Sequence, residues 1–443
     1  MLDQVIALRK KMHSIPEPSM KEYETKRLLM DFIAENTSLA LVDRGQWFFA
    51  HYVWSANSAH LENTAHPANP AHIANTAHPV NPAHPANTAH PGFGDRRKSI
   101  AFRADFDAVV GKDGCAAHLC GHDGHSAILA GLALELERMQ PEADVYLIFQ
   151  PGEETGQGAR LCRELLKEKK IDEIYGFHNI PGYEENVVLL RNATFACAST
   201  GMEISLKGQI SHAAYPEKGR NPALVMAEII LFMENFVHGK HEGVVLGTVI
   251  GAEIGSASYG VSAGEAVLRL TLRAEKPEEY QQLVDGISQF ANSKARQQGL
   301  ECQIRLLEEF PATVNHQECV DKVRAAAERV VAERVVAATE RVVAADGRTG
   351  AASDEAWLMS GKVGKADSEA GTADALRRIP IIYPEEPFRW SEDFGYYLQE
   401  AKGAFFGIGC GVDHAGLHTE GYEFNDEIIE TVIRIYRELI NGD

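Results

Sequence analysis

Short apolar segments of strand length alternate with segments of helical periodicity through most of this chain. The strand-like segments are residues 99–106, 145–150, 174–177 and 404–408. Between the first two, Ile128, Leu132, Leu136 and Met139 recur at the spacing of one helix face. This alternation predicts an α/β fold with a mainly parallel sheet and helices on both of its faces.

The pattern changes between residues 199 and 308. The order there becomes strand, helix, two strands, helix and strand, which is typical of a small α+β layer. We expect residues 199–308 to form a domain inserted into a first domain made of residues 1–198 and 309–443.

Two further segments have the composition of surface insertions. From about 52 to 95 the chain contains a six-residue repeat close to AHPANP, with histidine at every sixth position from His60 to His90. The repeat has few apolar residues to bury, and its prolines exclude helix and central strand. Residues 346–375, rich in Gly, Ala, Ser and Asp, follow a helix with the near-repeat ERVVA and are interpreted as a second irregular insertion.

The charge of the chain disfavours some classes of binding partner, and its cysteine content favours one cellular compartment. The chain has 63 acidic and 43 basic residues and a formal charge of -20, which repels nucleic acid and anionic lipid. No apolar run approaches the ~20 residues that a membrane helix needs. Seven scattered cysteines favour reduced thiols, and we therefore expect a cytoplasmic protein.

The segment HLCGHDGH, residues 118–125, places five metal-binding or acid-base groups in eight residues, before the helix expected from Ile128. Cys120 and His122, two residues apart on a loop, can converge on one metal ion, and the adjacent glycines permit a tight backbone. This density favours a metal site over an isolated structural histidine.

Other chemically active residues are expected at strand ends. Glu153 and Glu154 follow the strand that ends at Gln150, in a glycine-rich turn, and adjacent side chains diverge, so one can bind metal while the other faces a water. His178 and His418 also come after predicted strands and complete a two-metal set. Asp107 follows another strand and is suited to orient a metal-binding histidine through its second ring nitrogen.

Six motifs in this order resemble the co-catalytic metallo-amidohydrolases that include aminoacylases, hippurate hydrolases, indole-acetyl-amino-acid hydrolases and related carboxypeptidases. The motifs are HLCGHDGH, FQPGEETGQGA, GFHN, SHAAYPEKGRNPA, SEDF and GLHTE. The opening LRKKMHSIPEPSMKEYET is similar to the family's first helix. The chain departs from the family at 259–262, where relatives often carry Asn-Val-Ile-Pro, whose Asn contributes to recognition of the substrate carboxylate.

The resemblance implies a metal-binding catalytic domain, a lid domain that commonly forms the dimer, and two Zn or Mn ions. Residues that match the family's metal ligands are Cys120, His122, Glu154, His178 and His418. Glu153 matches the general base. His212 matches the lid histidine that reaches the partner's active site in dimeric members.

The activity expected from this resemblance is hydrolysis of N-acyl amino acids by a metal-activated water. Glu153 would accept a proton from that water, and His212 would help to hold the oxyanion. Three alternatives remain open: a dipeptidase or carboxypeptidase of the same family, a non-catalytic relative, and a metal-buffering protein that works through its histidine repeat.

Overall fold

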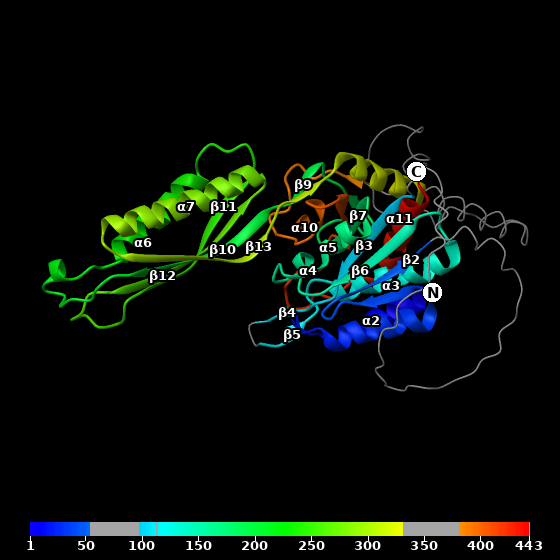
Figure 1. Cartoon of the computed structure of the whole chain (residues 1–443), viewed down its shortest axis with the longest axis horizontal. Helices are drawn as coiled ribbons and strands as arrows, with labels where there is room; N and C mark the ends of the chain where they lie inside the picture. Colours follow the sequence, from blue (N-terminus) through cyan, green and yellow to red (C-terminus); the bar gives the residue numbers. More distant parts are fainter. Residues whose placement is uncertain (54–96, 112–113, 331–380, 443) are drawn as a thin grey trace, which may run out of the picture.

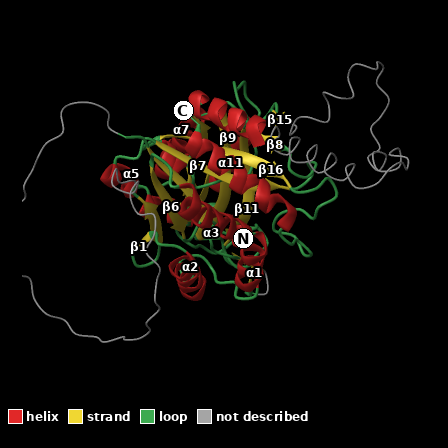
Figure 2. Cartoon of the chain, turned by 90° about the vertical axis from the view of Figure 1, so that its right-hand side faces the viewer, coloured by secondary structure: helices red, strands yellow, loops and turns green. Residues whose placement is uncertain are grey.

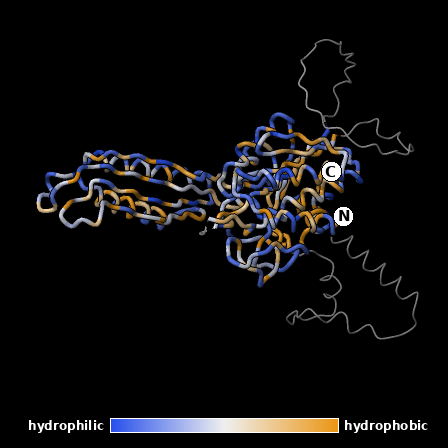
Figure 3. Tube along the Cα trace, turned by 90° about the horizontal axis from the view of Figure 1, so that it is seen from below, coloured by the Kyte–Doolittle hydropathy of each residue, from blue (hydrophilic) through white to orange (hydrophobic). Residues whose placement is uncertain are grey.

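The computed structural model describes residues 1–53, 97–111, 114–330 and 381–442. Figure 1 shows a larger unit that contains both chain ends and a smaller, elongated unit formed by residues 198–310. Figure 3, a view from below, shows the smaller unit projecting from the larger one as a narrow layer. Within the described residues, no helix is both long and apolar enough to span a membrane.

An eight-stranded sheet forms the centre of the larger unit, in the order β1-β2-β6-β3-β7-β16-β8-β15. In chain order these strands are β1 Ala40–Asp43, β2 Phe48–Tyr52, β3 Ser99–Asp105, β6 Asp144–Gln150, β7 Glu173–Ile180, β8 Val188–Leu189, β15 Ile381–Ile382 and β16 Lys402–Gly409. Strands β6, β3, β7 and β16 are mutually parallel, whereas β1 and β2 add antiparallel pairs at one edge. The predicted fold class, an α/β fold with a mainly parallel sheet, is confirmed.

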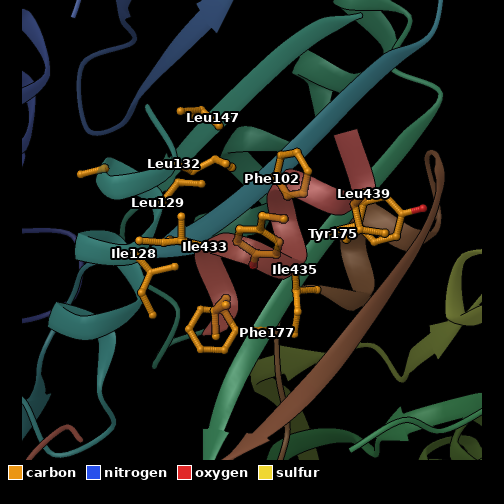
Figure 4. Close-up of a cluster of buried hydrophobic side chains, with 14 of the residues drawn as sticks. Phe102, Ile128, Leu129, Leu132, Leu147, Tyr175, Phe177, Ile433, Ile435 and Leu439 are labelled. Atoms are coloured by element: carbon orange, nitrogen blue, oxygen red, sulfur yellow. The ribbon is translucent and has the colours of Figure 1, made fainter. Parts of the chain in front are cut away.

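Helices cover both faces of this sheet, as Figure 2 shows. On one side lie α1 Leu2–His13, α2 Tyr23–Asn36, α3 His122–Met139, α11 Ile429–Asn441 and the helical residues 317–330; on the other lie α4 Gly158–Cys162, α5 Glu164–Lys169 and α10 Gly395–Leu398. Successive side chains of a strand point to opposite faces. Accordingly Leu147 of β6 packs in the hydrophobic cluster on the side of α3 and α11, and Ile148 packs in the cluster on the side of α4, α5 and α10. Figure 4 shows the cluster on the α11 side, with Phe102 and Tyr175 of the sheet near Ile433 and Leu439 of α11.

The smaller unit is a four-stranded antiparallel sheet, ordered β11-β12-β10-β13, with two helices on one face. Its elements are β10 Ala198–Lys207, η2 Pro216–Lys218, α6 Ala223–Val237, β11 Val245–Ile254, β12 Glu265–Ala274, α7 Pro277–Gln297 and β13 Glu301–Phe310. The side chains between sheet and helices form a separate hydrophobic cluster. A unit with its own core can carry residues to a site on the other unit while keeping its own shape.

The remaining short elements lie in the connections between the two units and in loops of the larger unit. They are β4 Val109–Val110 paired with β5 Ala116–Ala117, β9 Ala193–Ala196 paired with β14 Thr313–Asn315, and η3 Asp426–Ile428. Because β9 directly precedes β10 and β14 follows β13, the two crossings between the units lie side by side. The two segments interpreted as insertions fall almost wholly on residues 54–96 and 331–380, outside the described residues.

Candidate metal centre and active site

The carboxyl ends of the central parallel strands meet at one edge of the sheet, where open α/β sheets build their sites. Asp105 is the last residue of β3, and Glu153 and Glu154 follow the end of β6. The expectation that His178 lies beyond its strand is wrong. Strand β7 runs on to Ile180, because it stays paired with β16 up to that residue, and His178 is therefore part of the strand.

Cys120 and His122 lie where the loop before α3 becomes helix. The prediction that both residues sit on a loop, with the helix starting at Ile128, is wrong, since α3 begins at His122. Gly121 precedes it with φ of 97°, a conformation suited to glycine, and Asp123 places an acid in the first helical turn, where the helix dipole favours it. The earlier start holds the His122 backbone rigidly in the helix.

The five side chains expected to bind metal come together. Nε2 of His178 lies 3.4 Å from Sγ of Cys120, and Nε2 of His418 lies 3.3 Å from the same sulfur. Oε1 of Glu154 lies 3.4 Å from Nε2 of His418 and 3.7 Å from Nε2 of His122. Cys120, His122 and His178 form one group of three possible ligands, and Cys120, Glu154 and His418 form another. Two groups that share one sulfur suit two neighbouring ions.

The hydrogen bonds of His122 leave one ring nitrogen for a metal. Its Nδ1 lies 3.0 Å from Oδ1 of Asp107, a carboxylate that accepts the proton and orients the ring. Its Nε2 is buried and has no hydrogen-bond partner in the described part of the chain, and the same is true of Oε1 of Glu154. A histidine that donates through one nitrogen and presents the other is the usual arrangement at metal sites. Imidazole, thiolate and carboxylate donors together fit a divalent transition metal such as Zn²⁺.

Glu153 is buried beside this group. Its Oε2 lies 3.9 Å from Nε2 of His122, and its Oε1 accepts a hydrogen bond from the backbone N–H of Asp393. Burial, followed by the nearby carboxyl groups of Glu392 and Glu154, raises the pKa of Glu153 well above its usual range. A carboxylate with a raised pKa is suited to accept a proton near neutral pH.

A network of buried ion pairs lies next to Glu153, and the sequence analysis did not predict these pairs. Arg103 contacts Asp105 at 2.7 Å, Asp393 at 2.7 Å and Glu392 at 2.9 Å. The only signal in the sequence was the motif SEDF, residues 391–394, which indicated a resemblance but no pairing. The network holds the loop that carries Glu392 and Asp393 against the sheet edge.

A cavity of about 470 Å³ opens over the cluster, between the larger and the smaller unit. The cluster residues form one wall, and Arg273 of β12 and Glu308 of β13 contribute from the smaller unit. Trp390 also lines the cavity, with its ring 5.3 Å from that of His178. None of these three residues was singled out in the sequence, because no local motif marks them. The volume is within the range of small-molecule sites.

His212 lies away from the other expected site residues. Strand β10 leaves the cavity at Ser199 and runs to Lys207, a distance of about 26 Å at 3.3 Å per residue. The backbone of His212 then bridges to Val261, in the connection between β11 and β12 at that far end. The structure therefore does not bring His212 to the cluster of its own chain.

Residues 101–370 match the model of Peptidase family M20/M25/M40. An uncharacterized hydrolase of Staphylococcus epidermidis is 25% identical over 376 residues, which cover 79% of this chain and 85% of that protein. An N-acetyldiaminopimelate deacetylase of Listeria monocytogenes is 23% identical over 438 residues, 95% of this chain and 94% of the relative.

Two solved structures have the same fold. A putative aminohydrolase from methicillin-resistant Staphylococcus aureus superposes with a TM-score of 0.71 at 18% identity, covering 99% of this chain and 96% of the other. A dinuclear metal-binding peptidase of the M20 family from Bacillus subtilis gives a TM-score of 0.67 at 18% identity, covering 99% and 97%.

Proposed function

Because the chain belongs to Peptidase family M20/M25/M40, we propose that it hydrolyses the amide bond of N-acyl amino acids. Membership and the hydrolase relatives make the protein an enzyme that acts on carbon–nitrogen amide bonds, as the sequence motifs predicted. The finer assignment, to N-acyl amino acids, draws support from the Listeria relative, which is named as the deacetylase of an N-acetylated amino acid.

The observation that carries this proposal is a pair of buried ligand atoms, Nε2 of His122 and Oε1 of Glu154, that have no hydrogen-bond partner among the residues the structure describes. Both belong to a five-residue donor set. Cys120, His122, Glu154, His178 and His418 would hold two divalent ions, Zn or Mn. When bound, such ions lower the pKa of water toward about 7 and so make a nucleophile available at neutral pH. Asp107 orients the ring of His122 for this purpose.

In this proposal Glu153 acts first as the general base and then as the general acid. Its carboxylate accepts a proton from the attacking water and then delivers that proton to the nitrogen of the leaving amine. Its burial and its raised pKa support both halves of this cycle, because the group holds a proton more readily than an exposed glutamate does.

Arg273 is proposed to bind the substrate carboxylate. Its guanidinium donates to the backbone oxygen of Arg389 at 2.9 Å and to the Ser391 hydroxyl at 2.6 Å, and it lines the cavity. It has no carboxylate partner among the described residues, and burial lowers its pKa. A half-buried cation that has no carboxylate partner within the described residues offers an anionic ligand a strong contact.

The working form is proposed to be a homodimer joined through the smaller unit, which acts as lid. His212 is exposed and far from its own cluster, so it serves a site only if a second copy brings it there. Support comes from the exposed apolar residues Leu224 and Leu231 of α6, and from Ile250 on the edge strand β11. Apolar patches of this kind mark interaction surfaces.

We also place the enzyme in the cytoplasm, with a small N-acyl amino acid or dipeptide as its partner and neither nucleic acid nor membrane. None of the seven cysteines, all of which lie in the described part of the chain, forms a disulfide, which suits a reducing compartment. The charge of -20 disfavours anionic polymers and surfaces.

The test is a hydrolysis panel of N-acetyl and N-benzoyl amino acids and free dipeptides, using protein loaded with Zn²⁺ or Mn²⁺. Glu153→Gln should lower kcat by about 100-fold or more while two ions stay bound. Glu164→Gln, at an exposed position of helix α5, is the matched control and should keep full activity. Retention of most activity in Glu153→Gln at unchanged metal content would overturn the mechanism. Cleavage of free dipeptides alone would replace the proposed substrate class.

A further inference from the structure

His418 is carried by a loop that follows β16 and has few contacts with the core. The loop runs over residues 411–423, all of which the structure describes, and Tyr422 is the one buried residue among them. His418 itself has φ of 60°, a left-handed conformation that a residue other than glycine keeps only when its surroundings hold it there. Its backbone N–H donates to the Leu119 carbonyl at 2.8 Å. The side chain that fixes the rest of this loop is that of Tyr422.

The hydroxyl of Tyr422 ends a chain of buried polar side chains. It accepts a 2.6 Å hydrogen bond from Nδ2 of Asn179, which follows His178 in β7. Oδ1 of Asn179 lies 2.6 Å from Nε2 of His125, and Nδ1 of His125 lies 2.7 Å from Oδ1 of Asp105. Buried polar networks whose members all have partners hold those members rigidly. The chain therefore fixes the Tyr422 hydroxyl relative to β3, α3 and β7.

The pair of Asn179 and Tyr422 lies directly against Gly121. This glycine separates two of the expected metal ligands, Cys120 and His122. A Cβ atom at Gly121 would lie 2.5 Å from Oδ1 of Asn179 and 2.6 Å from the hydroxyl of Tyr422, so only glycine leaves room for the pair. One hydrogen bond therefore connects three segments that each supply expected ligands, namely this turn, strand β7 and the loop after β16.

The two groups of expected ligands differ in how firmly the fold holds them. Cys120, His122 and His178 are all buried, and they lie beside the start of α3 or within β7. The other group combines Cys120 with Glu154, which lies in a turn, and with His418, whose side chain is 49% exposed. A change that frees the loop after β16 should therefore affect the second group and leave the first one intact.

We propose that Tyr422 is a positioning residue whose hydroxyl, held by Asn179, sets the metal affinity of the group that contains His418. The inference rests on the proposed function, in which the five expected ligands hold two ions. Without the hydroxyl, the loop loses its link to β7 and His418 is no longer held toward Cys120. Contacts that orient a metal ligand change the affinity for the metal by about 10–100-fold. Because only one group uses His418, the affinity for only one of the two ions should fall.

The experiment titrates the metal-free protein with Zn²⁺ and follows binding by calorimetry. The unaltered protein should bind two ions per chain. Tyr422→Phe keeps the ring and removes only the hydroxyl, and it should weaken the binding of one ion by about tenfold or more while the affinity for the other stays unchanged. Tyr23→Phe removes a hydroxyl from an exposed side chain and is the matched control, which should change neither affinity.

Two double variants separate a positioning role from a general loss of structure. His418→Ala should leave one bound ion, and adding Tyr422→Phe should not change the affinity for that ion, because Tyr422 acts through His418. Asn179→Ala should weaken the same ion as Tyr422→Phe does, and the two changes together should cost no more than Asn179→Ala alone, since both break one hydrogen bond.

The possible results distinguish this inference from the proposed function. Tyr422→Phe that weakens both ions equally, or neither of them, would overturn the role of Tyr422. So would a further loss of affinity when Tyr422→Phe is added to His418→Ala, or additive effects of Tyr422→Phe and Asn179→Ala. Failure of the unaltered protein to bind two ions would instead overturn the proposed function.

Discussion

The hydroxyl of Ser19 donates a 2.7 Å hydrogen bond to Oδ2 of Asp107, the carboxylate whose other oxygen faces Nδ1 of His122. The same Oδ2 accepts a hydrogen bond from the backbone N–H of Glu154. The segment between α1 and α2 therefore supports the carboxylate that orients His122 and positions the turn of Glu154. Outer contacts of this kind hold metal ligands in place.

Ser19→Ala should weaken metal binding about tenfold, since Asp107 loses a donor that fixes its orientation. Titration of the metal-free protein with Zn²⁺ measures this effect directly. Ser14→Ala is the matched control, because its hydroxyl donates to the Lys11 carbonyl on the surface. Equal metal affinities for Ser19→Ala and the unaltered protein would show that Asp107 holds its position without Ser19.

Glu22 should make the stability of the metal-free protein depend on pH. Burial, followed by the charge of Asp107, raises the pKa of Glu22 from 4.5 to about 7. Between these values the folded protein binds more protons than the unfolded chain, so the free energy of unfolding falls as pH rises from about 4.5 to 7. Glu22→Gln keeps an oxygen for the N–H groups of Met20 and Gly152 and removes the titration.

Relative to the unaltered protein, Glu22→Gln should therefore gain up to about 3 kcal/mol between pH 4.5 and pH 8. Urea denaturation at the two pH values measures this change. Glu24→Gln, an exposed neighbour, should show no such gain. A stability difference that is the same at both pH values would contradict the prediction.

Arg103→Met should destabilise the protein by about 3–5 kcal/mol, because it leaves Asp105, Glu392 and Asp393 buried without their cation. Chemical denaturation gives the value. The comparison is Arg44→Met, which breaks a more exposed ion pair with Glu168 and should cost about 1 kcal/mol or less. Similar losses for the two variants would mean that the buried network contributes little.

Replacing residues 54–96 with about six Gly and Ser residues should leave the folded core and its metal content unchanged. Tyr52 pairs with Val145, which pairs in turn with Ile100, so the two ends to be joined lie at the same level of the sheet. They are two strands apart, about 10 Å, which a short linker spans. Two tightly bound ions per chain are expected by elemental analysis. Loss of tight binding would favour the alternative of a metal buffer that works through the histidine repeat.

Mixing two inactive variants tests the proposed role of His212. Glu153→Gln removes the base of its own chain, and His212→Ala removes the group offered to the partner. After exchange of subunits, half of the dimers are hybrids, and each hybrid has one intact site. About a quarter of the original activity should return. If the mixture stays inactive while mass measurements show hybrid dimers, His212 does not act on the partner's site.

The site residues that are close neighbours in the chain could be predicted from the sequence, because their spacing is visible there. Cys120 and His122 are two residues apart, and Glu153 directly precedes Glu154 after an apolar strand. Such short-range patterns determine which side chains share a turn or a strand end. The same patterns misplaced the start of α3 and the end of β7, since pairing with β16 and the left-handed Gly121 decide those boundaries.

The sequence by itself determined the α/β alternation, the strand and helix order of residues 199–308, and the residue types available for a metal site. Only the tertiary structure decided that Ser19 supports Asp107, that His212 lies far from its own cluster, and that Tyr422 lies against Gly121. These relationships join residues that lie far apart in the chain or on neighbouring strands. The order of strands in the sheets and the loop after β16 create them, and hydrophobic burial, which drives sheet packing, depends on the whole chain rather than on a motif.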